Sequence, residues 1–208
     1  MRSVIILFAK APVTGQVKTR LIPRLGPEDA ARLHTAFVAD MIERLQHFPG
    51  AALELHTDIP SDAWKQYSVA RKLQIPGDLG LKMFHSLSTA LTSGYERAMV
   101  VGTDAPTLPP DHLAGLLESS ADVALGPTED GGYYAISAKR THLEMFKGVA
   151  WSTVHTLRMT LEAFDRCGLT HELGETWFDI DEPADLERLR ACPDLPPHTR
   201  AMMDSRRS

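Results

Sequence analysis

The chain has 208 residues, of which 43% are hydrophobic and 24% charged, with a formal net charge of -5 at pH 7. These values are typical of one globular α/β domain, and the acidic balance excludes a surface built overall for nucleic acid. Two cysteines are too few for a disulfide framework, and the apolar N-terminal run is too short to cross a bilayer or to form a secretion signal. We therefore expect a cytoplasmic protein without nucleic-acid or membrane partners.

The first predicted strand, residues 3–9, runs into a basic loop. This loop places Lys10, Lys18 and Arg20 around Gly15. Glycine lets a backbone approach a ligand closely, and lysine and arginine neutralise phosphate charge. A solvated basic loop is the simpler alternative, but three cations beside a buried strand end in an acidic protein favour phosphate binding. The glycines that the P-loop of nucleotide hydrolases requires are missing, so that motif is excluded.

The rest of the chain alternates between helical and strand patterns, which indicates a three-layer α/β/α sandwich with a mostly parallel, Rossmann-like sheet. We expect one domain over residues 1–191 and a loose tail over residues 192–208. Helices are predicted at residues 27–45, 61–70, 79–91, 111–118, 152–166 and 184–190, and further strands at 52–57, 97–103, 122–126, 133–137 and 171–173.

Two clusters of carboxylates complement the basic loop. Asp104 follows a predicted strand, and Asp179 and Asp181 precede the last predicted helix. Each has a structural alternative, since aspartate also begins turns and caps helices. Ligands of open α/β sheets gather beyond the carboxyl ends of the strands, so Asp104 and the basic loop are expected to converge. Together with phosphate oxygens, Asp104 and Asp181, with Asp179 as a further candidate, suit Mg²⁺ or Mn²⁺.

Asp130 belongs to a glycine-rich turn, Glu129-Asp130-Gly131-Gly132, between two predicted strands. Asp-Gly is a strong hairpin signal, and the turn itself needs no further explanation. Asp130 could also contact a metal or accept the proton of an acceptor hydroxyl, so we count it with Lys18 and Asp104 as a candidate catalytic residue. Trp151-Ser152-Thr153 could contact the substrate or form a helix cap beside a core tryptophan, and we favour the cap.

With these residues in view, the chain resembles the nucleotide-diphospho-sugar transferase superfamily, which has the GT-A fold. Within it, the chain is similar to a bacterial group labelled DUF2064 and provisionally described as glycosyltransferases. The same order of motifs resembles the molybdenum-cofactor and phospholactate guanylyltransferases. Five ordered motifs carry the likeness: residues 8–12 with 15–21, Gln74 with 77–80, 102–106, 126–134 and 179–183.

The resemblance implies roles for individual residues. Lys10, Gly15, Lys18 and Arg20 would hold phosphates, Gln74 and Gly77 would lie near the base, and Asp104 and Asp181 would bind the metal. Three features depart from the pattern: Thr14 replaces a common proline, Leu81-Lys82 replaces a usual Glu-Arg pair, and a single acid at Asp104 replaces the Asp-x-Asp motif of many glycosyltransferases.

Three functions stay open at this level. The label of the group slightly favours Mg²⁺-dependent glycosyl transfer from a nucleotide sugar to a small acceptor. The basic loop favours nucleotidyl transfer, in which a nucleoside triphosphate reacts with a small phosphorylated acceptor and pyrophosphate leaves. A non-catalytic nucleotide-binding regulator is the third possibility.

Overall fold

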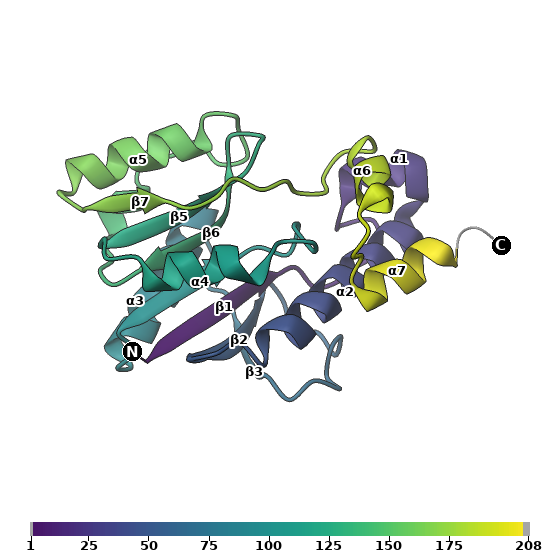
Figure 1. Cartoon of the computed structure of the whole chain (residues 1–208), viewed down its shortest axis with the longest axis horizontal. Helices are drawn as coiled ribbons and strands as arrows, with labels where there is room; N and C mark the ends of the chain where they lie inside the picture. Colours follow the sequence, from purple (N-terminus) through teal and green to yellow (C-terminus); the bar gives the residue numbers. More distant parts are fainter. Residues whose placement is uncertain (1, 206–208) are drawn as a thin grey trace.

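A computed structural model describes residues 2–205 (Figure 1). Its centre is a seven-stranded sheet in the order β3-β2-β1-β4-β6-β5-β7. The strands are β1 (Ser3–Ala9), β2 (Ala51–Thr57), β3 (Ala70–Leu73), β4 (Arg97–Val101), β5 (Val123–Pro127), β6 (Tyr133–Ala138) and β7 (His171–Leu173). Only β6 runs against its neighbours β4 and β5, and the other pairs are parallel. The predicted mostly parallel α/β sheet is confirmed.

Helices cover both faces of the sheet, as the continuous apolar runs of its inner strands require. The helices are α1 (Ile22–Leu25), α2 (Pro27–Leu45), α3 (Leu79–Thr92), α4 (Pro110–Glu118), α5 (Thr156–Arg166), α6 (Asp185–Ala191) and α7 (Pro197–Asp204), with 3₁₀ turns η1 (Thr19–Leu21) and η2 (Leu143–Phe146). Successive side chains of β1 enter opposite cores. Ile5 and Leu7 pack in the core that contains α2 and α4 residues, whereas Val4 and Ile6 pack in the core that contains α3 and α5 residues.

A third apolar cluster lies beyond one end of the sheet, where Figure 1 places α1, α6 and α7 together. Met202 and Met203 of α7 pack there with Phe37 of α2. Asp40 of α2 accepts hydrogen bonds from the backbone N–H groups of His198 and Thr199 at the start of α7. The expectation of a loose tail after residue 191 is therefore wrong for residues 197–204, because apolar burial and this distant cap hold the helix.

The segment predicted as a helix at residues 61–70 is instead a series of turns leading into β3. Trp64 is 2% exposed and has a φ of 60°, a left-handed conformation that an α-helix does not contain. Its indole N–H donates to the carbonyl of Thr35. Tertiary burial of one tryptophan thus overrides the local polar pattern.

The helix predicted from residue 152 begins only at Thr156, as part of α5. Ser152 has a φ of 59°, so the chain forms an irregular loop before the helix. Among the described residues 2–205, no helix is long and apolar enough to span a membrane.

Candidate functional site

Lys18 lies at the centre of the site. Its side chain is 4% exposed, and its Nζ lies 2.6 Å from Asp104 Oδ1 and 2.8 Å from Asp181 Oδ1. The same ammonium group donates to the carbonyl of Ile180 at 2.6 Å. The backbone at Lys18 is left-handed, with a φ of 46°, a conformation that non-glycine residues adopt rarely and mostly where surrounding contacts impose it. The loop thus places one cation between two carboxylates from distant parts of the chain.

The two carboxylates are brought together by a backbone hydrogen bond. Asp104 follows the end of β4, and the N–H of Ile180 donates to its carbonyl at 2.8 Å. This bond ties the segment between β7 and α6 to the edge of the sheet at which β1 and β4 end. The predicted convergence of the basic loop with Asp104 and Asp181 is a feature of the structure.

Charge and burial act in opposite directions on the central groups. Burial lowers the pKa of Lys18, but the charges of Asp104 and Asp181 raise it by more, so the net pKa is raised. Burial raises the pKa of Asp104, but Lys18 lowers it by more, so the carboxyl is ionised more readily than usual. Lys18 and Asp104 therefore carry full charges at neutral pH.

A cleft of about 560 Å³ lies over the basic loop. Four cationic side chains line it: Lys10, Lys18, Arg20 and Lys82. Gln74 also lines it and donates from its Nε2 to the carbonyl of His56. We name this space, with its four cations, the donor cleft.

The two predicted glycines do not line the donor cleft but shape its backbone. Gly15 has a φ of 79°, and Gly77 has a φ of 134° with a side chain of Leu81 so close that an added Cβ would lie 2.7 Å from it. Sequence reasoning missed His34 of α2. Its ring Nε2 lies 2.9 Å from the carbonyl of Lys10, and burial lowers its pKa. Nothing in the sequence distinguishes this histidine from any other on an amphipathic helix, so its contact with the basic loop could not be predicted.

A second pocket, of about 210 Å³, opens beside the donor cleft and shares Asp104, Asp181 and Arg20 with it. Asp130 and Asp179 also line this space. Burial, followed by the charges of Asp130, Asp181 and Asp104, raises the pKa of Asp179 to about 6. Trp151, interpreted from sequence as a core residue, lines the pocket as well. We name this space the acidic pocket.

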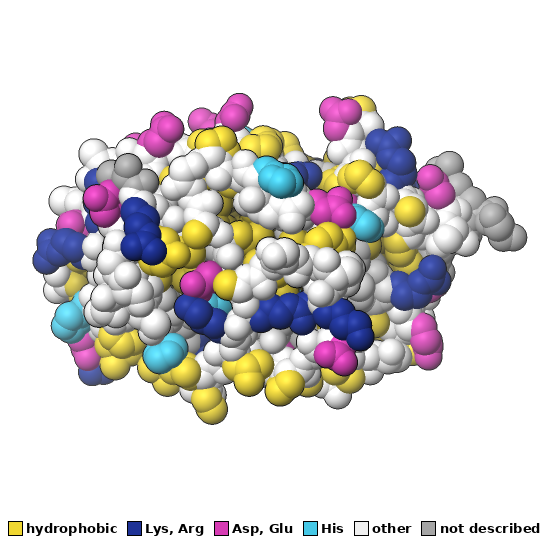
Figure 2. Space-filling view, turned by 90° about the horizontal axis from the view of Figure 1, so that it is seen from below, with side chains coloured by type: hydrophobic (Ala, Val, Ile, Leu, Met, Phe, Trp, Pro, Cys, Tyr) yellow, Lys and Arg dark blue, Asp and Glu magenta, His cyan; other side chains and the backbone are white. Residues whose placement is uncertain are grey.

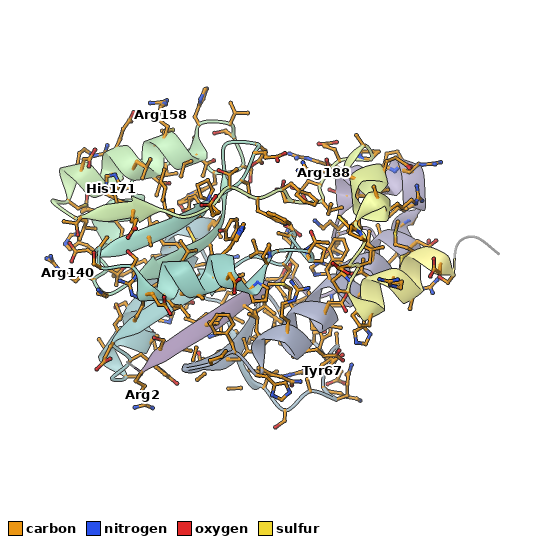
Figure 3. All side chains as sticks on the ribbon, in the orientation of Figure 1. Arg2, Tyr67, Arg140, Arg158, His171 and Arg188 are labelled. Carbon is orange, nitrogen blue, oxygen red and sulfur yellow. The ribbon has the colours of Figure 1, made fainter. Side chains whose placement is uncertain are left out.

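The residues around the acidic pocket are held by contacts between loops. Gly131 lies so close to Val154 that an added Cβ would be 2.3 Å from its carbonyl oxygen. On the outer side, Arg188 of α6, labelled in Figure 3, pairs with Glu129 through a 2.9 Å hydrogen bond and covers the ring of Phe178. The N–H of Leu157 in α5 also donates to the carbonyl of Gly131 at 2.8 Å, so the turn that carries Asp130 is fixed against both α5 and α6.

The carboxylates beside Lys18 supply only some of the ligands that Mg²⁺ needs. The described residues 2–205 contain no group of three or more His, Cys, Asp or Glu side chains placed to hold a metal ion. Asp104 and Asp181 each use one carboxylate oxygen on Lys18, and Arg20 lies 4.0 Å from the second oxygen of Asp181. Both aspartates line the donor cleft. Magnesium typically takes one or two carboxylates, with phosphate oxygens and waters completing six ligands. The residues fit a cation that arrives with a nucleotide.

Comparison with known proteins places this geometry among transferases. A nucleotide-diphospho-sugar transferase, provisionally so named, from Desulfovibrio desulfuricans G20 is 29% identical, with a TM-score of 0.87 over 99% of this chain and 95% of that one. A 2-phospho-L-lactate guanylyltransferase of Methanosarcina acetivorans is 27% identical over 83% of this chain and 80% of its own length. The match to its Methanosarcina barkeri counterpart, at 28% identity, spans half of each protein. The inositol-1-phosphate CTP transferase of T. maritima, at 15% identity and a TM-score of 0.58, shares the fold.

The fold and these relatives define the class as a transferase of the nucleotide-diphospho-sugar transferase type. The chain belongs to the bacterial family DUF2064, described as uncharacterized proteins conserved in bacteria, whose model matches residues 46–153. The predicted resemblance, fold class and enzyme class are confirmed.

Proposed function

We propose that this chain is a nucleotidyltransferase, which transfers a nucleoside monophosphate from a nucleoside triphosphate to a hydroxyl group of a small acceptor. The main support is the arrangement around Lys18, a buried ammonium group within 2.8 Å of both Asp104 and Asp181 at the mouth of a four-cation cleft. Four cations suit a triphosphate, which carries more negative charge than the diphosphate of a nucleotide sugar. The guanylyltransferase name of the Methanosarcina relatives agrees with this choice.

The step is a substitution at phosphorus. An acceptor hydroxyl oxygen attacks the α-phosphorus, the bond from that phosphorus to the bridging oxygen breaks, and pyrophosphate leaves with the electron pair. The hydroxyl proton passes to a carboxylate of the acidic pocket and then to water. Lys10 and Arg20 would hold the β- and γ-phosphates and stabilise the charge that develops on pyrophosphate. Lys18, whose three N–H groups are directed to Asp104, Asp181 and the carbonyl of Ile180, would add its positive charge without a direct hydrogen bond to phosphate. Gln74 also lines the donor cleft, where it would contact the base.

Asp104 and Asp181 would hold Mg²⁺ or Mn²⁺ together with the phosphates. The ion would supply charge neutralisation at the phosphate oxygens when bound. Lys18 keeps Asp104 ionised and holds Asp104 and Asp181 close together before the nucleotide enters, so the site is organised in advance.

Glycosyl transfer from a nucleotide sugar is the second candidate. The label of the DUF2064 group slightly favours it at the level of sequence. The name of the Desulfovibrio relative, which covers nearly the whole chain, favours it. The two reactions release different products: nucleotidyl transfer releases pyrophosphate, and glycosyl transfer releases a nucleoside diphosphate.

The test is product analysis. The purified protein is incubated with Mg²⁺ and a pool of small hydroxylated and phosphorylated metabolites, once with the four nucleoside triphosphates and once with nucleotide sugars. We expect pyrophosphate in the first mixture, abolished in Lys18→Ala. Nucleoside diphosphate in the second mixture, with no pyrophosphate in the first, would refute nucleotidyl transfer.

A further inference from the structure

The two halves of the site differ in the balance of their charges. The donor cleft is lined by four cations and by the carboxylates of Asp58, Asp104 and Asp181, whereas the acidic pocket is lined by the carboxylates of Asp104, Asp130, Asp179 and Asp181. Among the described lining residues of the acidic pocket, Arg20 is the single cation. Figure 2 shows Lys and Arg side chains in a row on one face of the molecule, so charges of one sign gather locally although the chain as a whole is acidic. The acidic pocket therefore has more negative than positive side chains in its lining.

Arg20 offers the acidic pocket little free positive charge. Its Nη1 lies 3.3 Å from a carboxylate oxygen of Glu182 and 4.0 Å from Asp181. It also lines the donor cleft, where the phosphates of the nucleotide would compete for it. Asp104 and Asp181 are paired with Lys18, but no such cation pairs with Asp130 or Asp179 among the described residues, so an anionic acceptor would meet these two carboxylates and no uncommitted cation of the pocket.

Several polar groups of the pocket wall already donate hydrogen bonds within the protein. The backbone N–H of Gly132 donates to Asp130 Oδ1, and the N–H of Thr153 donates to the hydroxyl of Thr156. Four lining hydroxyls donate within the protein: Thr128 to Asp130, Thr153 and Thr156 to the carbonyl of Ala150, and Tyr134 to the carbonyl of Glu175. The hydroxyl of Tyr133 is buried without a hydrogen-bond partner in the part of the chain that the structure describes, and Ser152 also lines the pocket, but most of the exposed polar atoms of the wall are acceptors, chiefly carboxylate oxygens.

Asp179 shows the same excess of negative charge. It carries no ion pair among the described residues, and its neighbours Asp130, Asp181 and Asp104 are all carboxylates. Carboxylate oxygens bind hydroxyl or ammonium hydrogens well and repel phosphate and carboxylate groups. Trp151 and Tyr133 add aromatic surface to the same space.

We infer that the acceptor is a small hydroxylated or aminated molecule without a phosphate or carboxylate group, bound by Asp130 and Asp179 in the acidic pocket. This inference rests on the proposed function for its chemistry, and it replaces the phosphorylated acceptor expected from sequence. The reacting hydroxyl attacks the α-phosphorus as above, and the hydroxyls or amines that do not react donate to Asp130 and Asp179.

The first arm of the test uses matched acceptors. Pyrophosphate release is measured with Mg²⁺ and nucleoside triphosphates for pairs that differ by one phosphate group, such as glucosamine and glucosamine 6-phosphate, or myo-inositol and its 1-phosphate. We expect the unphosphorylated members to react at least tenfold faster wherever a pair reacts. A preference for the phosphorylated members would overturn the inference while leaving nucleotidyl transfer intact.

The second arm of the test measures the charge of the acidic pocket by fluorescence quenching, without any enzymatic reaction. Quenching of Trp151 fluorescence by caesium and by iodide is compared at equal ionic strength in a Trp64→Phe, Trp177→Phe background. We expect caesium to quench several-fold better than iodide, and Asp130→Asn with Asp179→Asn to remove most of this difference. The matched control, Asp165→Asn with Asp194→Asn, removes the same charge from exposed positions and should change nothing.

The two arms separate the proposals. Iodide quenching equal to or above caesium quenching would overturn the inference even if no acceptor pair reacts. Failure to bind any nucleoside triphosphate would refute the proposed function, and the quenching result would still decide the charge of the acidic pocket.

Discussion

The backbone N–H of Ile180 donates to the carbonyl of Asp104 at 2.8 Å, although the two residues belong to different parts of the chain. This hydrogen bond sets the Asp179–Asp181 segment beside the end of β4, within reach of Lys18. The arrangement of the charged groups therefore depends on one main-chain contact, which is independent of the side chains that carry the chemistry.

Replacing Lys18 with Met should separate its structural role from its ligand role. The change leaves two neighbouring carboxylates without their cation, so we expect the free energy of unfolding to fall by ~1–3 kcal/mol, less than for a fully buried pair because both aspartates are partly exposed. Thermal stabilisation by Mn²⁺ alone should increase, and nucleoside triphosphate binding should weaken at least tenfold. Lys65→Met, at an exposed position, is the control. Unchanged Mn²⁺ and nucleotide responses would contradict the central position of Lys18.

Asp104→Asn should remove the Mg²⁺-dependent part of nucleotide affinity, because an amide is a poorer ligand for Mg²⁺ than a carboxylate. Calorimetric titration with and without Mg²⁺ measures this part directly. Asp62→Asn, at an exposed site, should behave as the wild type. The metal assignment fails if Asp104→Asn keeps the Mg²⁺ dependence of the wild type.

Gly131→Ala should loosen the acidic pocket. The added Cβ would lie 2.3 Å from the carbonyl oxygen of Val154, and the φ of 89° is unfavourable for alanine. Gly50→Ala is the matched control, since Gly50 has a φ of 74° and open space around it. We expect Gly131→Ala to lower the free energy of unfolding by ~1–3 kcal/mol more than Gly50→Ala, and to lower transferase activity. Equal denaturation midpoints would show that the contact with Val154 is unimportant.

Asp40→Asn should detach α7. Asp40 is 3% exposed and accepts hydrogen bonds from the N–H of His198 and from the N–H and hydroxyl of Thr199. An amide has only one acceptor oxygen, so we expect a loss of ~1–3 kcal/mol and faster proteolysis near α7. The exposed Asp194→Asn is the control. Tyr67, labelled in Figure 3, also reaches His198 and would retain part of the docking.

Acidification should destabilise the fold through His56. Burial lowers the pKa of His56 below 6.5, so the unfolded chain takes up a proton at a higher pH than the folded chain does. Its contribution to stability is full above pH 6.5 and is lost as the pH falls from 6.5 through the folded pKa, with a slope of at most ~1.4 kcal/mol per pH unit. We measure the free energy of unfolding by urea between pH 7.5 and 5, and expect it to fall less steeply with decreasing pH in His56→Gln than in the wild type. The same pH dependence in both proteins would exclude His56 as the source of the acid destabilisation.

Much of the sheet and of the site is predictable from local pattern. The strand of residues 3–9 and the helix that ends at Leu45 carry clear periodicity and end signals, and the expected meeting of Lys18 with Asp104 follows from the rule that ligands gather at the carboxyl ends of strands. Local sequence pattern does not predict contacts between residues that lie far apart in the chain. Trp64 is turned by burial against α2, and α7 is held by Asp40, which lies far from it in sequence.

The acidic pocket shows the same limit. Asp130 was a candidate from its turn, but its proximity to Asp179 depends on how the segment between β7 and α6 crosses the sheet edge. Trp151 was interpreted as part of a cap because the sequence around it resembles a helix start. Its position in the pocket follows from the left-handed Ser152 and the delayed start of α5.

The most direct test of nucleotidyl transfer is calorimetric titration of the wild-type protein with a nucleoside triphosphate and with a nucleotide sugar of the same base, both in Mg²⁺. Our account predicts at least tenfold tighter binding of the triphosphate, and loss of that preference in Lys10→Ala with Lys18→Ala. Tighter binding of the nucleotide sugar, unaffected by the loss of the two lysines, would contradict it.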